Sequence, residues 1–289
     1  MTKVLGIIGG SGIYEIEGME NSQWIPVEST FGNPSDELLI GTVEDLKVVF
    51  LPRHGRGHKL SPSTINYRAN IDALKRAGVT DLVSISACGS FREEMAPGDF
   101  VLVDQFIDRT FAREKSFFTD GLVAHVSVAH PTCGKLGEVI KSAANNTENK
   151  LHDGGTYLAM EGPQFSTLAE SHLYRSWGCD VIGMTNMPEA KLAREAEICY
   201  ATVAMVTDYD SWHPDHGEVD VVAIRNTLVT NSSNARELIK NIIPVLNDDQ
   251  LRHPCAQGCD HALEYALITS GEIDPILKAK ISAVAGRVL

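Results

Sequence analysis

The sequence has no uninterrupted apolar run of the roughly 18 residues that a transmembrane helix requires, and its first residues lack the pattern of a signal peptide. We therefore expect a cytoplasmic protein that does not span a membrane. The sequence also lacks internal repeats, low-complexity segments and a linker rich in proline or glycine. A chain of 289 residues can form one or two domains. Because no such linker is found, we expect a single domain that spans residues 1–289.

Positive charge is scarce as well. The chain has 25 Lys and Arg residues against 38 Asp and Glu residues, which gives a formal net charge of −13. Nucleic acids and anionic membrane surfaces are bound by clustered Lys and Arg, so this excess of negative charge opposes both. We expect neither as a partner. The content of 43% hydrophobic and 22% charged residues is typical of a globular protein.

The six cysteines are too dispersed for the disulfide framework of a small secreted protein. They are Cys88, Cys133, Cys179, Cys199, Cys255 and Cys259. Cys255 and Cys259 stand near His253 and His261, which permits a metal site, but their spacing matches no strong zinc pattern. A structural role for the cysteines is favoured, and no metal is expected.

Strand-like and helix-like patterns alternate along the chain, which predicts an α/β fold. Strands are expected at 4–8, 38–40, 48–51, 82–87, 100–103, 156–160, 181–184 and 199–206. Helices are expected at 64–77, 133–144, 168–177, 186–197 and over most of 219–246 and 260–285, so that a helical tail covers about 250–289. Asn186, with Pro188 in the first turn and Glu189 three residues later, is typical of a helix start.

Several predicted strands end in small or polar residues, and open α/β sheets bind ligands at the carboxyl ends of their strands. Gly9-Gly10-Ser11-Gly12 follows the first strand and can offer backbone N–H groups to an anion. It is not a dinucleotide fingerprint, because Glu15 stands where the third glycine belongs, and it lacks the Walker ending. A simple tight turn is the alternative.

Other strand ends point to an anion too. Arg53 to Lys59 concentrates cationic side chains in an acidic chain, and Arg53 and His54 can bind a phosphate. The small residues of 84–90 and the Met184-Thr185 segment before a helix favour negative charge as well. A solvated basic loop and ordinary strand ends are the structural alternatives.

Asp208 and Asp210 follow a hydrophobic strand and would point the same way in an extended segment. When two carboxyl groups lie close together, the pKa of one of them is raised. A carboxyl group that is protonated can donate its proton to a ring nitrogen. Metal ligation and a turn stabilised by aspartate remain alternatives. Phe165 lies on a loop and suits stacking on a planar base, or else simple packing in the core.

These residues occur in segments that resemble the methylthioadenosine phosphorylase branch of the trimeric purine nucleoside phosphorylase family. The similar segments keep the order and spacing of that family, and the similarity thins after about Val221. They are Ile7 to Gly12, Pro52 to Gly55, Ser86 to Ser90, Glu161 to Ser166, Val181 to Thr185 with Pro188-Glu189, and Thr207 to Asp210.

The resemblance implies a nucleoside phosphorylase-like fold, with a central mixed, twisted sheet flanked by helices. It also implies phosphorolysis, in which inorganic phosphate, a co-substrate and not a cofactor, attacks the anomeric carbon of a nucleoside. The phosphate ligands would be Ser11, Arg53, His54, Ser86, Ala87 and Thr185. Met184 would pack on the ribose and Phe165 near the base.

At the base, the resemblance implies that Asp208 protonates or hydrogen-bonds N7 and that Asp210 accepts from the exocyclic amine of adenine. Ser166 and Val221 stand where this branch differs from ordinary nucleoside phosphorylases, with Val221 in a pocket for the methylthio group. His125 would approach the 5′ end of the sugar across the interface of a homotrimer.

The activity implied is conversion of 5′-methylthioadenosine to adenine and 5-methylthioribose 1-phosphate, without metal or organic cofactor. Three alternatives stay open: a phosphorylase acting on methylthioinosine or another 6-oxopurine nucleoside, a nucleosidase that uses water, and a nucleoside sensor without turnover. Enzymes for 6-oxopurines in this superfamily have Asn where this chain has Asp208, which favours a base that carries an amine.

Overall fold

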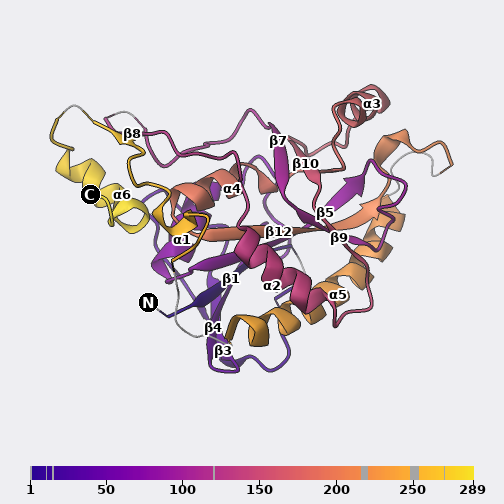
Figure 1. The fold of residues 1–289 in the computed structure, drawn as a ribbon, viewed down its shortest axis with the longest axis horizontal. Helices are drawn as coiled ribbons and strands as arrows, with labels where there is room; N and C mark the ends of the chain where they lie inside the picture. Colours follow the sequence, from indigo (N-terminus) through magenta and orange to yellow (C-terminus); the bar gives the residue numbers. More distant parts are fainter. Residues whose placement is uncertain are drawn as a thin grey trace.

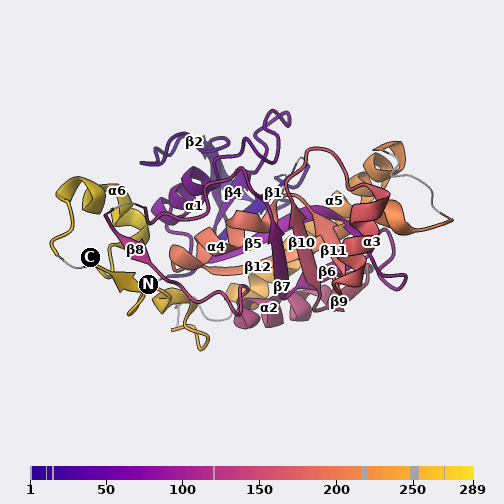
Figure 2. The ribbon, with the colours of Figure 1, turned by 90° about the horizontal axis from the view of Figure 1, so that it is seen from above.

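The computed structural model describes residues 2–10, 12–14, 16–119, 121–215, 221–247, 254–269 and 271–289. It has a broad sheet between two layers of helices (Figures 1 and 2). The predicted α/β fold with a central mixed sheet flanked by helices is confirmed. No helix of the described ranges is both long and apolar enough to cross a bilayer.

The described residues form the following elements. The strands are β1 (Val4–Gly9), β2 (Glu20–Ile25), β3 (Leu38–Val43), β4 (Leu46–Pro52), β5 (Asp81–Ser90), β6 (Phe100–Val103), β7 (Gln105–Arg109), β8 (Val123–Ala124), β9 (Leu151–Asp153), β10 (Thr156–Met160), β11 (Val181–Gly183), β12 (Cys199–Asp208) and β13 (Leu267–Ile268). The helices are α1 (Tyr67–Arg76), α2 (Gly134–Ala144), α3 (Leu168–Ser176), α4 (Asn186–Glu195), α5 (Val221–Asn247) and α6 (Pro275–Ala285), with short 3₁₀ segments η1 (Asp210–Trp212) and η2 (Cys259–His261).

Eleven of these strands form one mixed sheet in the order β2-β3-β4-β1-β5-β11-β10-β7, with β12 pairing β5 and β6 and with β9 pairing β6. Strands β4, β1, β5 and β12 are joined by parallel pairs, so their carboxyl ends meet at one edge of the sheet. Strands β3 and β4 form an antiparallel pair joined by a short turn. Strands β8 and β13 form a separate two-stranded sheet.

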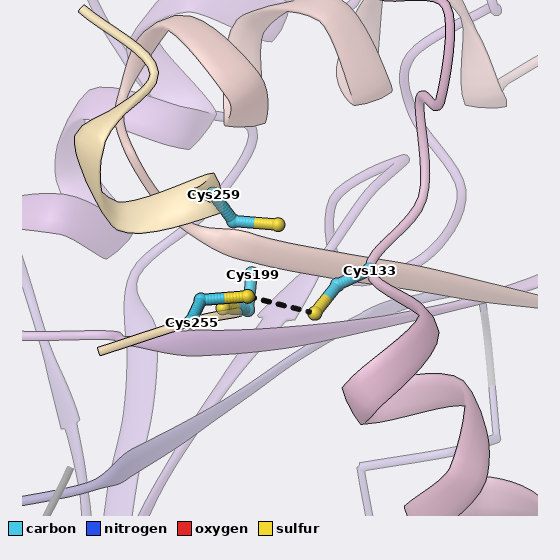
Figure 3. A group of neighbouring side chains, drawn as sticks. All are labelled: Cys133, Cys199, Cys255 and Cys259. Carbon is cyan, nitrogen blue, oxygen red and sulfur yellow. Dashed lines mark hydrogen bonds between the residues drawn. The ribbon is translucent and has the colours of Figure 1, made fainter. Parts of the chain in front are cut away.

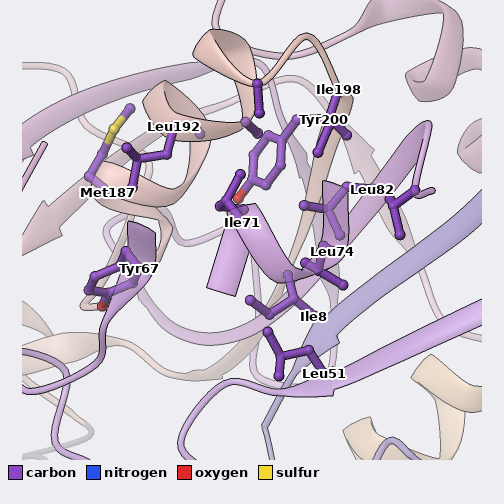
Figure 4. Close-up of a cluster of buried hydrophobic side chains, with 14 of the residues drawn as sticks. Ile8, Leu51, Tyr67, Ile71, Leu74, Leu82, Met187, Leu192, Ile198 and Tyr200 are labelled. Atoms are coloured by element: carbon purple, nitrogen blue, oxygen red, sulfur yellow. The ribbon is translucent and has the colours of Figure 1, made fainter. Parts of the chain in front are cut away.

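The alternation of side chains along β1 explains why helices cover both faces of the sheet. Val4 and Ile8 belong to a core cluster with residues of α1, α4 and α6, part of which Figure 4 shows. Leu5 and Ile7 belong to a second cluster with residues of α2 and α5. Successive side chains of a strand point to opposite faces, so both faces of this strand are buried. Each fully buried Leu or Ile contributes about 1.5–3 kcal/mol to folding.

Two similar sequence patterns start helices differently. At α3, the Thr167 side chain accepts from Glu170 N and the Glu170 carboxylate accepts from Thr167 N, which is a complete capping box. At α4, the predicted helix start at Asn186 is confirmed, but Asn186 does not cap the helix, because the residue before the helix is Thr185 and no side chain caps it. Asn186 and Glu189 are instead buried partners of the cavity described below.

The chain after residue 254 departs from the predicted helical tail. In the described part of this segment, α6 is its one α-helix, and residues 254–269 form turns, η2 and β13. Strand β13 pairs with β8, and α6 packs on α1. The prediction failed because apolar residues such as Leu263 are buried through tertiary contacts and not along one face of a helix.

Candidate active site

A cavity of about 440 Å³ opens at the sheet edge where the parallel strands end. Its walls come from the carboxyl ends of β1, β5, β11 and β12, from the segment after β4, from the loop after β10, and from one face of α5. These elements are far apart in the sequence, from Gly10 to Ser232. The separate strand ends singled out from the sequence therefore meet at one cavity.

Most of the predicted site residues line this cavity: Arg53, His54, Ser86, Ala87, Phe165, Met184, Thr185, Asp208 and Asp210. Ser166 lies behind Asp210. His125 does not line the cavity; it is exposed beside β8, and its backbone N–H donates to the Ala266 carbonyl. Ser11 and the side chain of Val221 fall outside the described residues.

Two carboxyl groups define one end of the cavity, which we name the carboxyl end (Asp208, Asp210 and Ser166). Asp208 accepts from the Thr207 hydroxyl at 2.6 Å and from the backbone N–H of Asp210 at 2.9 Å. The hydroxyl of Ser166 lies 2.7 Å from each carboxylate oxygen of Asp210. Each carboxyl group is thus held in place by a hydroxyl group.

The segment is extended only as far as Asp208, which corrects the expected parallel orientation of the two carboxyls. Asp210 has a φ of 49° and begins η1, so the chain turns sharply between them. The pKa of Asp208 is raised, as predicted, but burial is the main cause and the charge of Asp210 is a minor one. A carboxyl group with a raised pKa can hold a proton for transfer to a ligand.

The other end of the cavity holds a buried cation. We name it the arginine end (Arg53, Glu189, His54, Ser86 and Thr185). The Arg53 guanidinium is 1% exposed, and its Nε and Nη2 donate to the two carboxylate oxygens of Glu189 at 2.8 and 3.1 Å. Burial opposes the charge of Arg53, but Glu189 outweighs it and raises the pKa of the guanidinium. Arg53 therefore keeps its positive charge in the folded protein.

Arg53 also ties the strand ends together. Its Nη2 donates to the Ile8 carbonyl and to the Ser84 hydroxyl, and its Nη1 donates to the Ile85 carbonyl at 2.9 Å. Because Nη1 carries two N–H groups and makes one such bond within the described chain, one donor remains for a ligand. Most of the hydrogen-bond donors of Arg53 thus hold the walls of the cavity together.

His54 is neutral at physiological pH. Its Nδ1 lies 2.8 Å from the Leu60 carbonyl, which accepts a hydrogen bond and so fixes the Nδ1–H tautomer. The ring stacks on His58 with centroids 4.2 Å apart. Burial lowers the pKa of His54 to about 4, since an imidazolium is poorly solvated there and Arg53 lies nearby. The Nε2 atom of the neutral ring accepts a proton and does not donate one.

Buried amide and hydroxyl groups complete the arginine end. Ser86 donates to Asn186 Oδ1 at 2.8 Å, and the Asn186 amide nitrogen donates to the hydroxyls of Tyr200 and Thr202. Ala87 is exposed to the cavity at the end of β5. Thr185 precedes α4, where backbone N–H groups favour an anion.

Two charged residues that support these walls were not predicted from the sequence. Glu189 was taken as part of a helix start, and nothing in its local sequence marks it as the partner of Arg53. Arg113 was not singled out at all. It is buried, and it donates to the carbonyls of Met184, Met187 and Glu161, which fixes the loops on either side of the cavity.

The remainder of the basic segment lies away from the cavity. Arg56 pairs with Asp36 at 2.7 Å and Glu37 at 2.8 Å and covers the ring of Trp24. Of the basic side chains in this segment, Arg53, His54 and His58 line the cavity. The anion site predicted for the whole segment is therefore smaller than the composition suggested.

A cavity that joins a buried carboxyl group to a buried, partly available arginine suits transfer of a group from a base to an anion. In keeping with this, the chain belongs to the phosphorylase superfamily, whose family model matches residues 4–244. The family resemblance stated from the sequence is thereby confirmed.

Two similar proteins carry names that state a more specific activity. An S-methyl-5′-thioadenosine phosphorylase of Cereibacter sphaeroides is 66% identical over 290 residues, which cover 100% of this chain and 99% of the relative. The S-methyl-5′-thioadenosine phosphorylase of Rhodospirillum rubrum is 59% identical, and the match covers 99% of this chain and 97% of the relative.

Solved structures agree with these sequences. A methylthioadenosine phosphorylase sourced from an antarctic soil metagenomic library superposes with a TM-score of 0.91 at 44% identity, covering 98% of this chain and 99% of that chain. The methylthioadenosine phosphorylase of Schistosoma mansoni in complex with adenine gives a TM-score of 0.80 at 34% identity, covering 86% of this chain and 92% of that chain.

Proposed function

We propose that this chain is a pentosyltransferase that converts 5′-methylthioadenosine and inorganic phosphate to adenine and 5-methylthioribose 1-phosphate, a step of purine and methionine salvage. The observation that carries the proposal is that a half-buried carboxyl with a raised pKa, Asp208, and a buried arginine, Arg53, line one cavity. Relatives that match over the full length and carry this activity in their names support it.

In this proposal phosphate binds at the arginine end. The free N–H of Arg53 Nη1, the hydroxyls of Ser86 and Thr185, and the Ala87 backbone would donate to it, with Ser11 as a further ligand from the glycine-rich turn. His54 Nε2, which is an acceptor, would bind the proton of a hydrogen phosphate ion. The Ser86 hydroxyl turns from Asn186 to the phosphate when the anion arrives.

The base binds at the carboxyl end. A phosphate oxygen forms a bond to C1′ as the bond from C1′ to N9 breaks, and the electron pair of that bond moves into the purine ring. Asp208 gives its proton to N7, which makes the base a better leaving group. Asp210, held by Ser166, accepts from the 6-amino group and selects adenine over hypoxanthine.

The sugar occupies the apolar middle of the cavity. Met184 would pack on the ribose, Phe165 near the base, and Val221 against the methylthio group. The side chain of Phe165 is 47% exposed, so a bound purine would cover it. His125 is exposed and outside the cavity of its own chain, which supports a homotrimer in which it reaches the sugar of a neighbouring subunit.

The proposed reaction needs no metal and no organic cofactor, because phosphate is the nucleophile and Asp208 the acid. We place the enzyme in the cytoplasm, with nucleoside and phosphate as its small-molecule partners and no partner among nucleic acids or membranes. The net charge of −13 supports this, since it repels polyanions while one local arginine serves a single small anion.

The substrate is tested by comparing 5′-methylthioadenosine with methylthioinosine and inosine at saturating phosphate. Release of adenine should be the faster reaction, because Asp210 accepts from an amine and is left facing another acceptor by a 6-oxo group. A clear preference for the 6-oxopurine nucleosides would contradict this assignment of Asp208 and Asp210. Light scattering of the same sample tests the trimer.

A further inference from the structure

Four cysteines that have no part in the proposed reaction meet in the core, on the side of the sheet covered by α2 (Figure 3). They are Cys133, which precedes α2; Cys199, the first residue of β12; and Cys255 and Cys259 of the segment that follows α5. All four are buried, and their Sγ atoms lie within 4.8 Å of one another.

We propose that Cys133, Cys199, Cys255 and Cys259 bind one zinc ion as a structural site of four thiolates. A tetrahedral zinc with bonds of about 2.3 Å places its sulfur atoms about 3.8 Å apart. The Sγ atoms of Cys133 and Cys255 are 3.7 Å apart. The other separations, within 4.8 Å, need shifts on the order of an ångström to reach that geometry.

The donor set favours zinc over other divalent ions. Thiolates select zinc or iron in tetrahedral sites, whereas magnesium and calcium require oxygen ligands. Cys255 and Cys259 have three residues between them, which is within the usual spacing of one pair of zinc ligands. The other two ligands come from distant parts of the chain, which is why the sequence showed no zinc pattern.

The surroundings also suit a metal centre that carries excess negative charge. Four thiolates and one zinc ion have a net charge of −2, and Arg194 of α4 donates from Nη1 to Cys259 Sγ at 3.1 Å. The Asp260 carboxylate accepts from the backbone N–H of Cys255 at 3.1 and 3.2 Å, which fixes the turn between the two neighbouring ligands. Such outer contacts orient the ligands of metal sites.

A pair of disulfides is the competing use of four close thiols. A disulfide requires sulfur atoms about 2.05 Å apart. None of the six cysteines, all of which lie in the described ranges, forms a disulfide in the structure. In a reducing compartment, which we propose for this enzyme, thiols stay available to a metal.

Zinc at this position would fasten the C-terminal segment to the body of the protein. Two of the proposed ligands belong to the segment that continues into β13 and α6. The other two are Cys133, directly before α2, and Cys199 of β12. Strand β13 pairs with β8, and Ala266 accepts from the backbone of His125. The site is thus structural and lies outside the cavity that binds nucleoside and phosphate.

The test is the metal content of the full chain, purified under reducing conditions after growth with zinc and without affinity purification on immobilised metal. Elemental mass spectrometry should find one zinc per chain. Cobalt added to metal-free protein should give the sulfur-to-metal charge-transfer band and the ligand-field bands of a tetrahedral tetrathiolate site. Both readouts use the unmodified protein, so neither depends on a variant that folds.

Variants then locate the ion. Cys259→Ser and Cys255→Ser should lose the zinc, whereas Cys179→Ser, which changes another buried cysteine, should retain one zinc per chain. Arg194→Gln should weaken zinc binding by about 10–100-fold. Zinc well below one per chain, iron in place of zinc, or peptides that link these cysteines by disulfides would each contradict the proposal.

Discussion

The two ends of the cavity use buried charge in different ways. At the carboxyl end, Asp208 and Asp210 are held by hydroxyl and N–H donors, and burial leaves Asp208 with a raised pKa. At the arginine end, the charge of Arg53 is neutralised by Glu189, and most of its N–H groups bind the protein itself.

The difference separates two tasks of the site. Asp208 is placed to change its protonation state during the reaction, so its environment is made unfavourable for charge. Arg53 must stay charged and fixed, so its environment stabilises the charge. Loss of Asp208 should therefore affect turnover more than folding, and loss of the partner of Arg53 should affect folding as much as turnover.

The largest effect on turnover is expected from Asp208→Asn. Removal of a general acid costs roughly 10²- to 10⁴-fold in kcat, and the protein should keep its melting temperature because the amide is of similar size. The measurement is phosphate-dependent release of adenine, with Asp45→Asn at an exposed turn as the control. A folded variant with unchanged kcat would remove Asp208 from its catalytic role.

Glu189→Gln should lower the free energy of unfolding by about 3–5 kcal/mol, because it leaves the buried charge of Arg53 without a partner. Denaturant unfolding measures this loss. Glu17→Gln is the matched control, since it breaks an exposed ion pair with Lys240 and should leave the stability nearly unchanged. Equal stability of the two variants would show that the Arg53–Glu189 pair does not support the fold.

The lowered pKa of His54 predicts that the free energy of unfolding depends on pH. Its pKa of about 4 in the folded protein lies below the ordinary 6.5, so the unfolded chain binds the proton first. Stability is therefore expected to fall as the pH is lowered from about 6.5 to about 4, by at most about 3 kcal/mol from this residue.

The comparison that isolates His54 is the difference between the unfolding free energies of the wild type and of His54→Gln across this pH range. Burial raises the pKa of Glu195 to about 7, which gives the opposite slope over part of the same range. This contribution is present in both proteins and cancels in the difference. Parallel curves for the two proteins would rule out the buried, neutral His54.

The smallest effect is expected from Ser166→Ala, which removes the hydroxyl group that holds Asp210. A hydrogen bond to a charged group contributes about 1.5–3 kcal/mol, so kcat/KM for 5′-methylthioadenosine should fall by roughly tenfold or more. Ser176→Ala at an exposed position of α3 is the control. If both variants kept full activity, Ser166 would have no role in the position of Asp210.

The sequence was sufficient for features that follow from local patterns, such as the places where strands end. The strand ends at Gly10, Arg53, Ser86 and Asp208 were predicted to meet because parallel strands end at one sheet edge, and they do. The residues that were missed or misread act through distant partners. Glu189 and Asn186 have the spacing of a helix start, as do Thr167 and Glu170, yet one pattern caps a helix and the other supports Arg53 and Ser86.

The physical reason for these two outcomes is the proline at position 188. A residue before proline is steered away from the helical conformation, and Met187 has φ −120° and ψ 132°. This opens the first turn of α4 and leaves the side chain of Asn186 free to face β5 and β12. The cysteine cluster could not be predicted for a related reason, because Cys133 and Cys199 meet Cys255 and Cys259 only in the folded chain.

In the proposed reaction phosphate, and not water, takes the sugar from the base. The most direct measurement is to identify the sugar product formed from 5′-methylthioadenosine, with phosphate present and after its removal. We predict 5-methylthioribose 1-phosphate in amounts equal to adenine, and almost no adenine without phosphate. Free methylthioribose, released at the same rate when phosphate is absent, would show that the enzyme is a nucleosidase and not a phosphorylase.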